Sequence, residues 1–104
     1  MPVITGGVHK ALEQSPPEMA IVTTGVADLS ETACALIVGG VRRILLEKPG
    51  GADKTEIIAV VNAAKKNKAE VQIAYNRRFY ASTFAAQKII EDDGGVVSYR
   101  YFIF

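Results

Sequence analysis

Short runs of aliphatic and β-branched residues alternate along the chain with longer amphipathic segments. The short runs predict buried strands over residues 2–5, 19–24, 43–47, 71–75 and 96–104. The longer segments carry apolar residues at helical spacing and predict helices over 7–14, 29–38, from 53 onward, and 81–92. This βαβαβαβαβ order with short connections predicts an α/β fold, a partial Rossmann-like parallel sheet with right-handed crossovers and helices on its faces.

Two of the predicted helices begin with the spacing of a capping box, in which two side chains satisfy backbone amides of the first turn. Asp28 is followed by Glu31, and Asp53 is followed by Glu56. These pairs predict helix starts at residues 28 and 53. In the second of these helices the predicted apolar face comprises Ile57, Val60, Val61 and Ala64.

The composition is that of a globular protein and narrows the partners. Hydrophobic residues make up 49% and charged residues 22% of the 104 residues. A net charge of +1 gives no reason to expect nucleic acid or a membrane as partner. Cys34 and His9 are the single cysteine and the single histidine. Hence we expect neither a disulfide framework nor a metal site, and a reducing cytoplasm fits best.

Polar residues follow two consecutive predicted strands. Glu47-Lys48-Pro49 ends the 43–47 strand, and the 71–75 strand runs into Asn76-Arg77-Arg78-Phe79. In an open parallel sheet the carboxyl ends of the strands border the ligand crevice. We therefore expect Lys48 and Arg78 to lie along one edge, suited to chemistry on a polar small molecule beside a cofactor.

Each of these residues also has a plainer interpretation. Lys48 could be a solvated lysine paired with Glu47, and Arg77 and Arg78 could be a solvated pair at the sheet rim. Aromatic residues beside them are more often core or interface residues than substrate contacts, which applies to Tyr75 and Phe79.

The ordered set of motifs resembles the glucose–fructose oxidoreductase/inositol dehydrogenase/MocA (Gfo/Idh/MocA) family. The motifs are Thr-Thr at the end of the strand at 19–24, then Glu-Lys-Pro, then Tyr-Asn-Arg-Arg-Phe, then Gly-Gly and an aromatic strand. The resemblance implies an NAD(P)-dependent oxidoreductase of sugars or polyols. It also implies that residues 1–95 are the C-terminal part of a Rossmann-type dinucleotide-binding domain, and that 96–104 is the first strand of a C-terminal domain.

The resemblance assigns a role to the Glu-Lys-Pro motif. Lys48 matches the lysine that lies near the nicotinamide and hydrogen-bonds the substrate hydroxyl that loses hydride. A lysine suits this role because its ammonium stabilises a developing alkoxide. Glu47 would fix the lysine in place, and Pro49 would follow a cis peptide bond.

Further roles follow from the same resemblance. Thr23 and Thr24 match a segment along the ribose and nicotinamide of NAD or NADP, so they join Glu47–Pro49 as expected cofactor contacts. Tyr75 and Arg78 match positions at the substrate rim. Gly50 and Gly51 stand where the family has a bulkier pair.

Other parts of the family's pattern do not occur in the chain. No Gly-x-Gly-x-x-Gly follows a strand, and no Asp-x-x-x-His pair occurs. We therefore expect a fragment, incomplete at both ends and inactive alone. Two alternatives stay open at this point. One is a non-catalytic truncated module that forms homo-oligomers through residues 96–104, where an unpaired strand would template association. The other is a weak nucleotide-binding module.

Overall fold

The computed structural model describes residues 3–13 and 15–102. The chain forms two compact units, Met1–Ala74 and Tyr75–Phe104. Each unit is described by itself below. Within the described residues, no helix has the length and apolar character needed to cross a membrane.

The first unit is built on a three-stranded parallel sheet in the order β1-β2-β3. Its strands are β1 (Met19–Val22), β2 (Arg43–Leu46) and β3 (Glu70–Ile73), and the helices between them are α2 (Leu29–Val38) and α3 (Lys54–Asn67). A short helix α1 (Gly7–Leu12) precedes β1, and a 3-10 turn η1 (Val26–Asp28) leads into α2. The prediction of a partial Rossmann-like α/β fold with a parallel sheet is confirmed.

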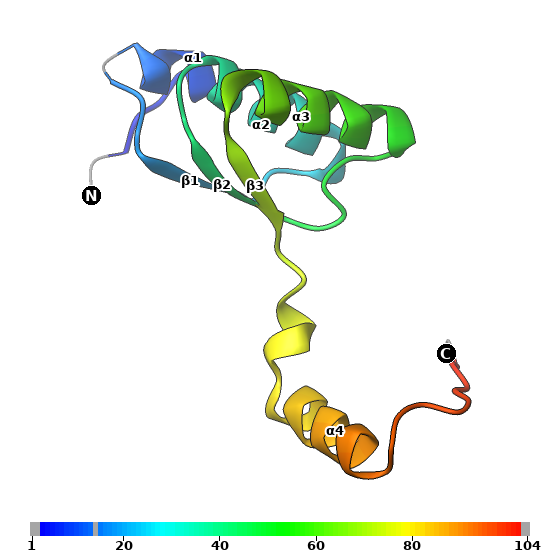
Figure 1. The fold of residues 1–104 in the computed structure, drawn as a ribbon. Coiled ribbons are helices and arrows are strands. Elements are labelled where there is room, and N and C mark those ends of the chain that lie inside the picture. Colours follow the sequence, from blue (N-terminus) through cyan, green and yellow to red (C-terminus); the bar gives the residue numbers. More distant parts are fainter. Residues whose placement is uncertain (1–2, 14, 103–104) are drawn as a thin grey trace. The chain divides into compact units, whose positions relative to one another are not determined.

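The core lies between the sheet and the two helices α2 and α3, which cover the same face (Figure 1). Strand residues alternate between faces, so Val22, Ile44 and Leu46 are buried while Met19, Ile21 and Leu45 are exposed. The helices and the loop before β2 complete the core with Leu29, Ala33, Ile37, Val41 and Val60. Within the described residues of the first unit, α2 and α3 pack on one face of the sheet, and the side chains on its other face, such as Met19 and Ile21, are exposed.

The two predicted capping boxes differ in outcome. At α3 the carboxylate of Asp53 accepts a hydrogen bond of 2.9 Å from the backbone N–H of Glu56, as predicted. At α2 the Asp28 side chain makes no capping bond. Asp28 already belongs to η1, with φ −104° and ψ −6°, so its backbone is not in the extended conformation from which a cap residue reaches into the helix.

The buried face of α3 is narrower than predicted. Val60 is buried and Ala64 is partly buried, but Ile57 and Val61 are 41% and 43% exposed. Ala63 packs against the core instead. The small side chains at 63 and 64 thus face the core, and the two larger ones lie at the margin of the buried face.

The second unit contains a 3-10 turn η2 (Asn76–Phe79) and the helix α4 (Ala81–Asp92). The predicted helix over 81–92 is confirmed. The Thr83 hydroxyl donates a 2.8 Å hydrogen bond to the Arg77 carbonyl and links the two elements. No residue of α4 is buried.

Two predicted strands are wrong over the described residues. Residues 3–5 and 96–102 belong to no strand, while Pro2 and residues 103–104 of these predictions lie outside the described residues, as does Gln14 of the predicted 7–14 helix. A strand exists only when a neighbour completes its backbone hydrogen bonds. Val3, Val97 and Tyr99 are instead 89%, 102% and 89% exposed. High β-propensity alone did not produce a strand.

Candidate functional site

The three strands end in one row, which brings the residues that follow them to a common edge. Val22, Leu46 and Ile73 share a register position. The Glu47 amide donates to the Val22 carbonyl over 2.9 Å, and the Ala74 amide donates to the Leu46 carbonyl over 2.8 Å. Thr23, Glu47 and Ala74 therefore follow side by side at the carboxyl edge of the sheet. Thr23 and Thr24 lie just beyond β1 and are exposed.

Lys48 occupies a tight turn at this edge. The Gly50 amide donates a 3.1 Å hydrogen bond to the Glu47 carbonyl, and the Lys48–Pro49 peptide bond is cis, as the resemblance implied. This is the arrangement of a β-turn with cis-proline at its third position. Lys48 and Pro49 are exposed and Glu47 is half-buried. Among the described residues, Lys48 forms no salt bridge with Glu47, so the paired-lysine interpretation is not supported.

Gly50 and Gly51 let this turn pack directly against β3 and α3. Gly50 has φ +91°, which favours glycine, and a Cβ added there would lie 2.7 Å from Cδ1 of Ile73 on β3. A Cβ on Gly51 would lie 2.9 Å from Cβ of Glu56 on α3. From sequence these glycines were only a departure from the family's pattern. In the structure they are the residues that bring the Lys48 turn close to β3 and α3.

Glu56 is a further residue whose role was missed from sequence. Its carboxylate accepts a 2.7 Å hydrogen bond from the backbone amide of Ala52, in the loop that follows Lys48. Its carbonyl accepts a 3.1 Å hydrogen bond from the hydroxyl of Ser30, a buried residue of α2. The Asp53–Glu56 spacing was the available signal, but it predicted a bond to the Asp53 amide rather than to that of Ala52.

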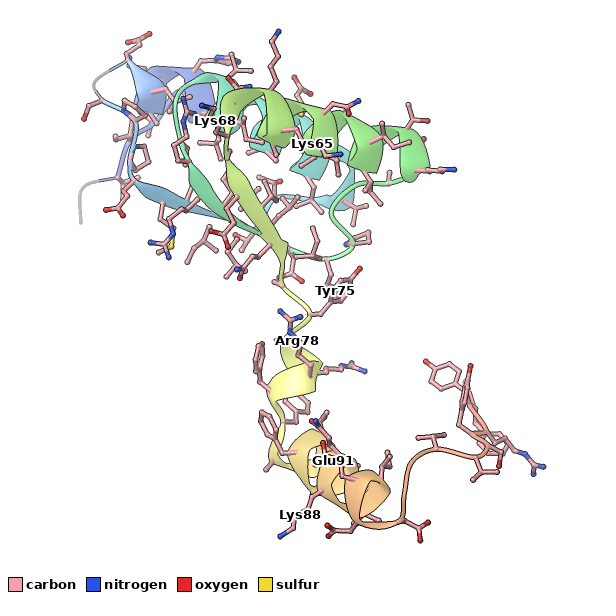
Figure 2. All side chains as sticks on the ribbon, viewed as in Figure 1. Lys65, Lys68, Tyr75, Arg78, Lys88 and Glu91 are labelled. Carbon is pink, nitrogen blue, oxygen red and sulfur yellow. The ribbon has the colours of Figure 1, made fainter. Side chains whose placement is uncertain are left out.

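Tyr75 and Arg78 belong to the second unit (Figure 2). The guanidinium of Arg78 lies over the ring of Phe79, 4.9 Å from its centroid, within the range of a cation–π contact. Tyr75 and Phe79 are 55% and 64% exposed, so neither is a core residue of this unit. That Arg78 shares an edge with Lys48 stays a prediction.

Comparison with solved structures shows which proteins share this fold. The chain is similar to the structure of yvaA from Bacillus subtilis, a proposed oxidoreductase, with 26% identity and a TM-score of 0.72 over 79% of this chain. It is also similar to the WlbA dehydrogenase of Bordetella pertussis in complex with NADH and UDP-GlcNAcA, with 18% identity and a TM-score of 0.74 over 81% of the chain. Myo-inositol 2-dehydrogenase from Lactobacillus plantarum matches over 79% with 19% identity and a TM-score of 0.70. These neighbours are oxidoreductases of the Gfo/Idh/MocA type. The chain has their fold.

The resemblance noted from the sequence is thus confirmed for the fold of the Gfo/Idh/MocA-type oxidoreductases. The chain covers 24%, 25% and 24% of these three structures, about a quarter of each. No protein-family model and no curated protein matches the sequence.

Within residues 3–13 and 15–102, no cluster of three or more histidine, cysteine, aspartate or glutamate side chains could hold a metal ion.

Proposed function

We propose that the chain is the central part of an NAD(P)-dependent oxidoreductase that acts on sugars or polyols. The observation that carries this proposal is the Lys48 turn at the carboxyl edge of a parallel sheet, in a fold shared with dehydrogenases. One of those neighbours binds NADH and a nucleotide sugar, and another acts on an inositol. The domain division at residues 95 and 96 belongs to the same proposal.

The residues at the edge have distinct roles in this proposal. The cofactor supplies the hydride chemistry when bound. Lys48 donates a hydrogen bond to the carbinol oxygen of the substrate and stabilises the negative charge that develops there. Thr23, Thr24 and the Glu47–Pro49 turn contact the ribose and nicotinamide of NAD or NADP. Tyr75 and Arg78 contact the sugar or polyol.

Titration of the ¹⁵N-labelled chain with NADH, followed by NMR, tests the cofactor site. We expect weak binding, with a Kd of about 1 mM, and shift changes centred on Thr23, Thr24 and Lys48. Lys48→Ala should reduce these changes, whereas Lys65→Ala on α3 is the matched control and should not (Figure 2). Changes centred elsewhere, or none up to several times that concentration, would overturn the proposal.

Activity assays test the expectation that the chain alone is inactive. We expect no oxidation of sugars or polyols with NAD or NADP. Turnover that disappears in Lys48→Ala but persists in Lys65→Ala would show this expectation to be wrong. A parallel titration with AMP separates the weak nucleotide-binding alternative, which predicts equal shift changes with AMP and with NADH.

A second candidate function, a non-catalytic module that self-associates, is favoured by residues 96–102. Val97, Tyr99 and Tyr101 are 102%, 89% and 79% exposed in a segment with high β-propensity. Light scattering tests this candidate. A monodisperse homo-oligomer that dissociates in Tyr99→Asp supports it, and a monomer at all concentrations contradicts it.

A further inference from the structure

We infer that Glu56 is a positioning residue for Lys48, an inference that rests on the proposed function. Three hydrogen bonds besides those within the helix backbone meet at Glu56. Its amide donates to Asp53 over 2.9 Å, its carboxylate accepts from Ala52 over 2.7 Å, and its carbonyl accepts from Ser30 over 3.1 Å. These bonds connect α2, the start of α3 and the loop that carries Lys48.

The loop between Lys48 and α3 is held at every residue after the proline. Gly50 packs against Ile73, and its amide closes the turn on Glu47. Gly51 is buried against the side chain of Glu56, and the Ala52 amide donates a hydrogen bond to the Glu56 carboxylate. Lys48 itself is exposed, so its place depends on this backbone. Without the carboxylate, the Ala52 amide loses its hydrogen-bond partner, and the loop loses the side-chain contact that ties it to the first turn of α3.

The bond to Ala52 distinguishes this arrangement from an ordinary helix cap. In a capping box the glutamate returns to the amide of the cap residue, which is Asp53 here. The Glu56 carboxylate instead reaches the preceding amide, outside the helix, over 2.7 Å. That length is at the short end for a charge-assisted hydrogen bond, which is stronger than a neutral one. The Glu56 carboxylate thus fixes the loop, whereas the Glu56 amide, bonded to Asp53, caps the start of the helix.

Glu56→Ala tests the inference in the complete chain, with Glu56→Gln as the rescue variant and Glu31→Ala as the matched control. Glu31 is also a first-turn glutamate, on α2. Glutamine keeps an oxygen that can accept from Ala52. We expect hydrogen exchange at the Ala52 amide to rise about tenfold in Glu56→Ala, with larger backbone motion at Lys48 by ¹⁵N relaxation. Glu56→Gln should restore most of both, and Glu31→Ala should change neither.

The NADH titration then links the loop to the site. In Glu56→Ala the shift changes at Thr23 and Lys48 should weaken severalfold, with recovery in Glu56→Gln. Unchanged exchange and relaxation in Glu56→Ala would overturn the inference, as would a loosened loop with undiminished NADH binding. If the unsubstituted chain is silent towards NADH, the proposed function fails, while exchange and relaxation still decide whether Glu56 fixes the Lys48 loop. Sheet amide shifts confirm that each variant is folded.

Discussion

The two units of the chain differ in how they use apolar residues. All eight aromatic residues of the sequence lie in Tyr75–Phe104, yet no described residue of that unit is buried. The first unit has no aromatic residue, and its core is built from Leu, Ile, Val and Ala side chains such as Leu29 and Leu46, both fully buried. Apolar surface is hidden only where a second layer faces it. The sheet and α2–α3 provide two such layers, whereas α4 and η2 do not.

The difference also explains where a precise site can form. Lys48 stands on a turn fixed by three packed elements, β2, β3 and α3. Arg78 stands on the 3-10 turn η2, where its described contact is the neighbouring Phe79 ring. Rigid placement of a functional group requires neighbours whose own positions are fixed. The first unit supplies them for Lys48.

The largest expected contrast between the units comes from truncating one apolar side chain in each. Leu29→Ala should destabilise the first unit by about 2–5 kcal/mol, because it removes buried methyl groups and leaves a cavity. Phe84→Ala on α4, a side chain 54% exposed, should change stability by no more than about 0.5 kcal/mol. Urea unfolding followed by NMR measures both. If Leu29→Ala does not fold, Leu29→Met should fold with a loss of about 1 kcal/mol. Equal effects of the two alanine variants would contradict the comparison.

Two glycines with similar backbone geometry sharpen the comparison. Gly50 and Gly94 have φ of +91° and +83°, but an added Cβ meets Ile73 at 2.7 Å in the first case and nothing within 4 Å in the second. Gly50→Ala should cost about 2–3 kcal/mol, from the left-handed backbone and the overlap together. Gly94→Ala should cost about 1 kcal/mol, from the backbone alone.

Ile73→Val provides the internal check on Gly50→Ala. It removes the Cδ1 atom that the new Cβ would meet. In urea unfolding, the double variant should recover part of the loss, so the two substitutions should not be additive. Strict additivity would show that steric overlap with Ile73 is not the cause.

A smaller contrast concerns one serine in each unit. Ser30 is 7% exposed and donates to the Glu56 carbonyl, so Ser30→Ala should cost about 1 kcal/mol through the lost hydrogen bond. Ser82→Ala on the exposed α4 should stay within about 0.5 kcal/mol. Thermal unfolding of both variants measures the difference. If Ser30→Ala leaves the thermal unfolding midpoint unchanged, the α2–α3 contact is held by packing alone.

Much of the first unit was predictable from sequence because its patterns match its packing. The strands at 19–22, 43–46 and 70–73 and the helix at 29–38 coincide with short buried runs and helical periodicity. The 96–104 strand was wrong over 96–102 because residue type reports β-propensity and not the presence of a neighbouring strand. The buried face of α3 was predicted too wide for a similar reason. Periodicity shows which residues share a face of a helix, but not which of them a neighbouring element covers.

The candidate site was predictable only in part. Parallel strands place Thr23, Glu47 and Lys48 at one edge, which is a general property of such sheets. The packing of Gly50 on Ile73 and the bond from Ala52 to Glu56 depend on the path of the loop. No local pattern encodes that path, so these contacts appear only in three dimensions.

The smallest expected contrast concerns thiol chemistry. Burial raises the pKa of the Cys34 thiol, and a hydrogen bond with Ser30 lowers it by less. The folded chain therefore favours the neutral thiol, whereas the unfolded chain ionises from roughly pH 8.5. Cys34 should thus lower the free energy of unfolding only as pH rises above that value. Cys34→Ala should remove this part of the pH dependence of the free energy of unfolding.

Alkylation rates test the same group directly, because the thiolate is the reactive form. At pH 8, iodoacetamide should modify Cys34 several times more slowly than a cysteine placed on α4 by Ser82→Cys in the Cys34→Ala background. The slow rate should reach that of the α4 thiol when urea unfolds the first unit. Equal rates in the folded chains would mean that Cys34 on α2 is as open to solvent as the surface of α4. The contrast in burial between the two units would then fail at this position.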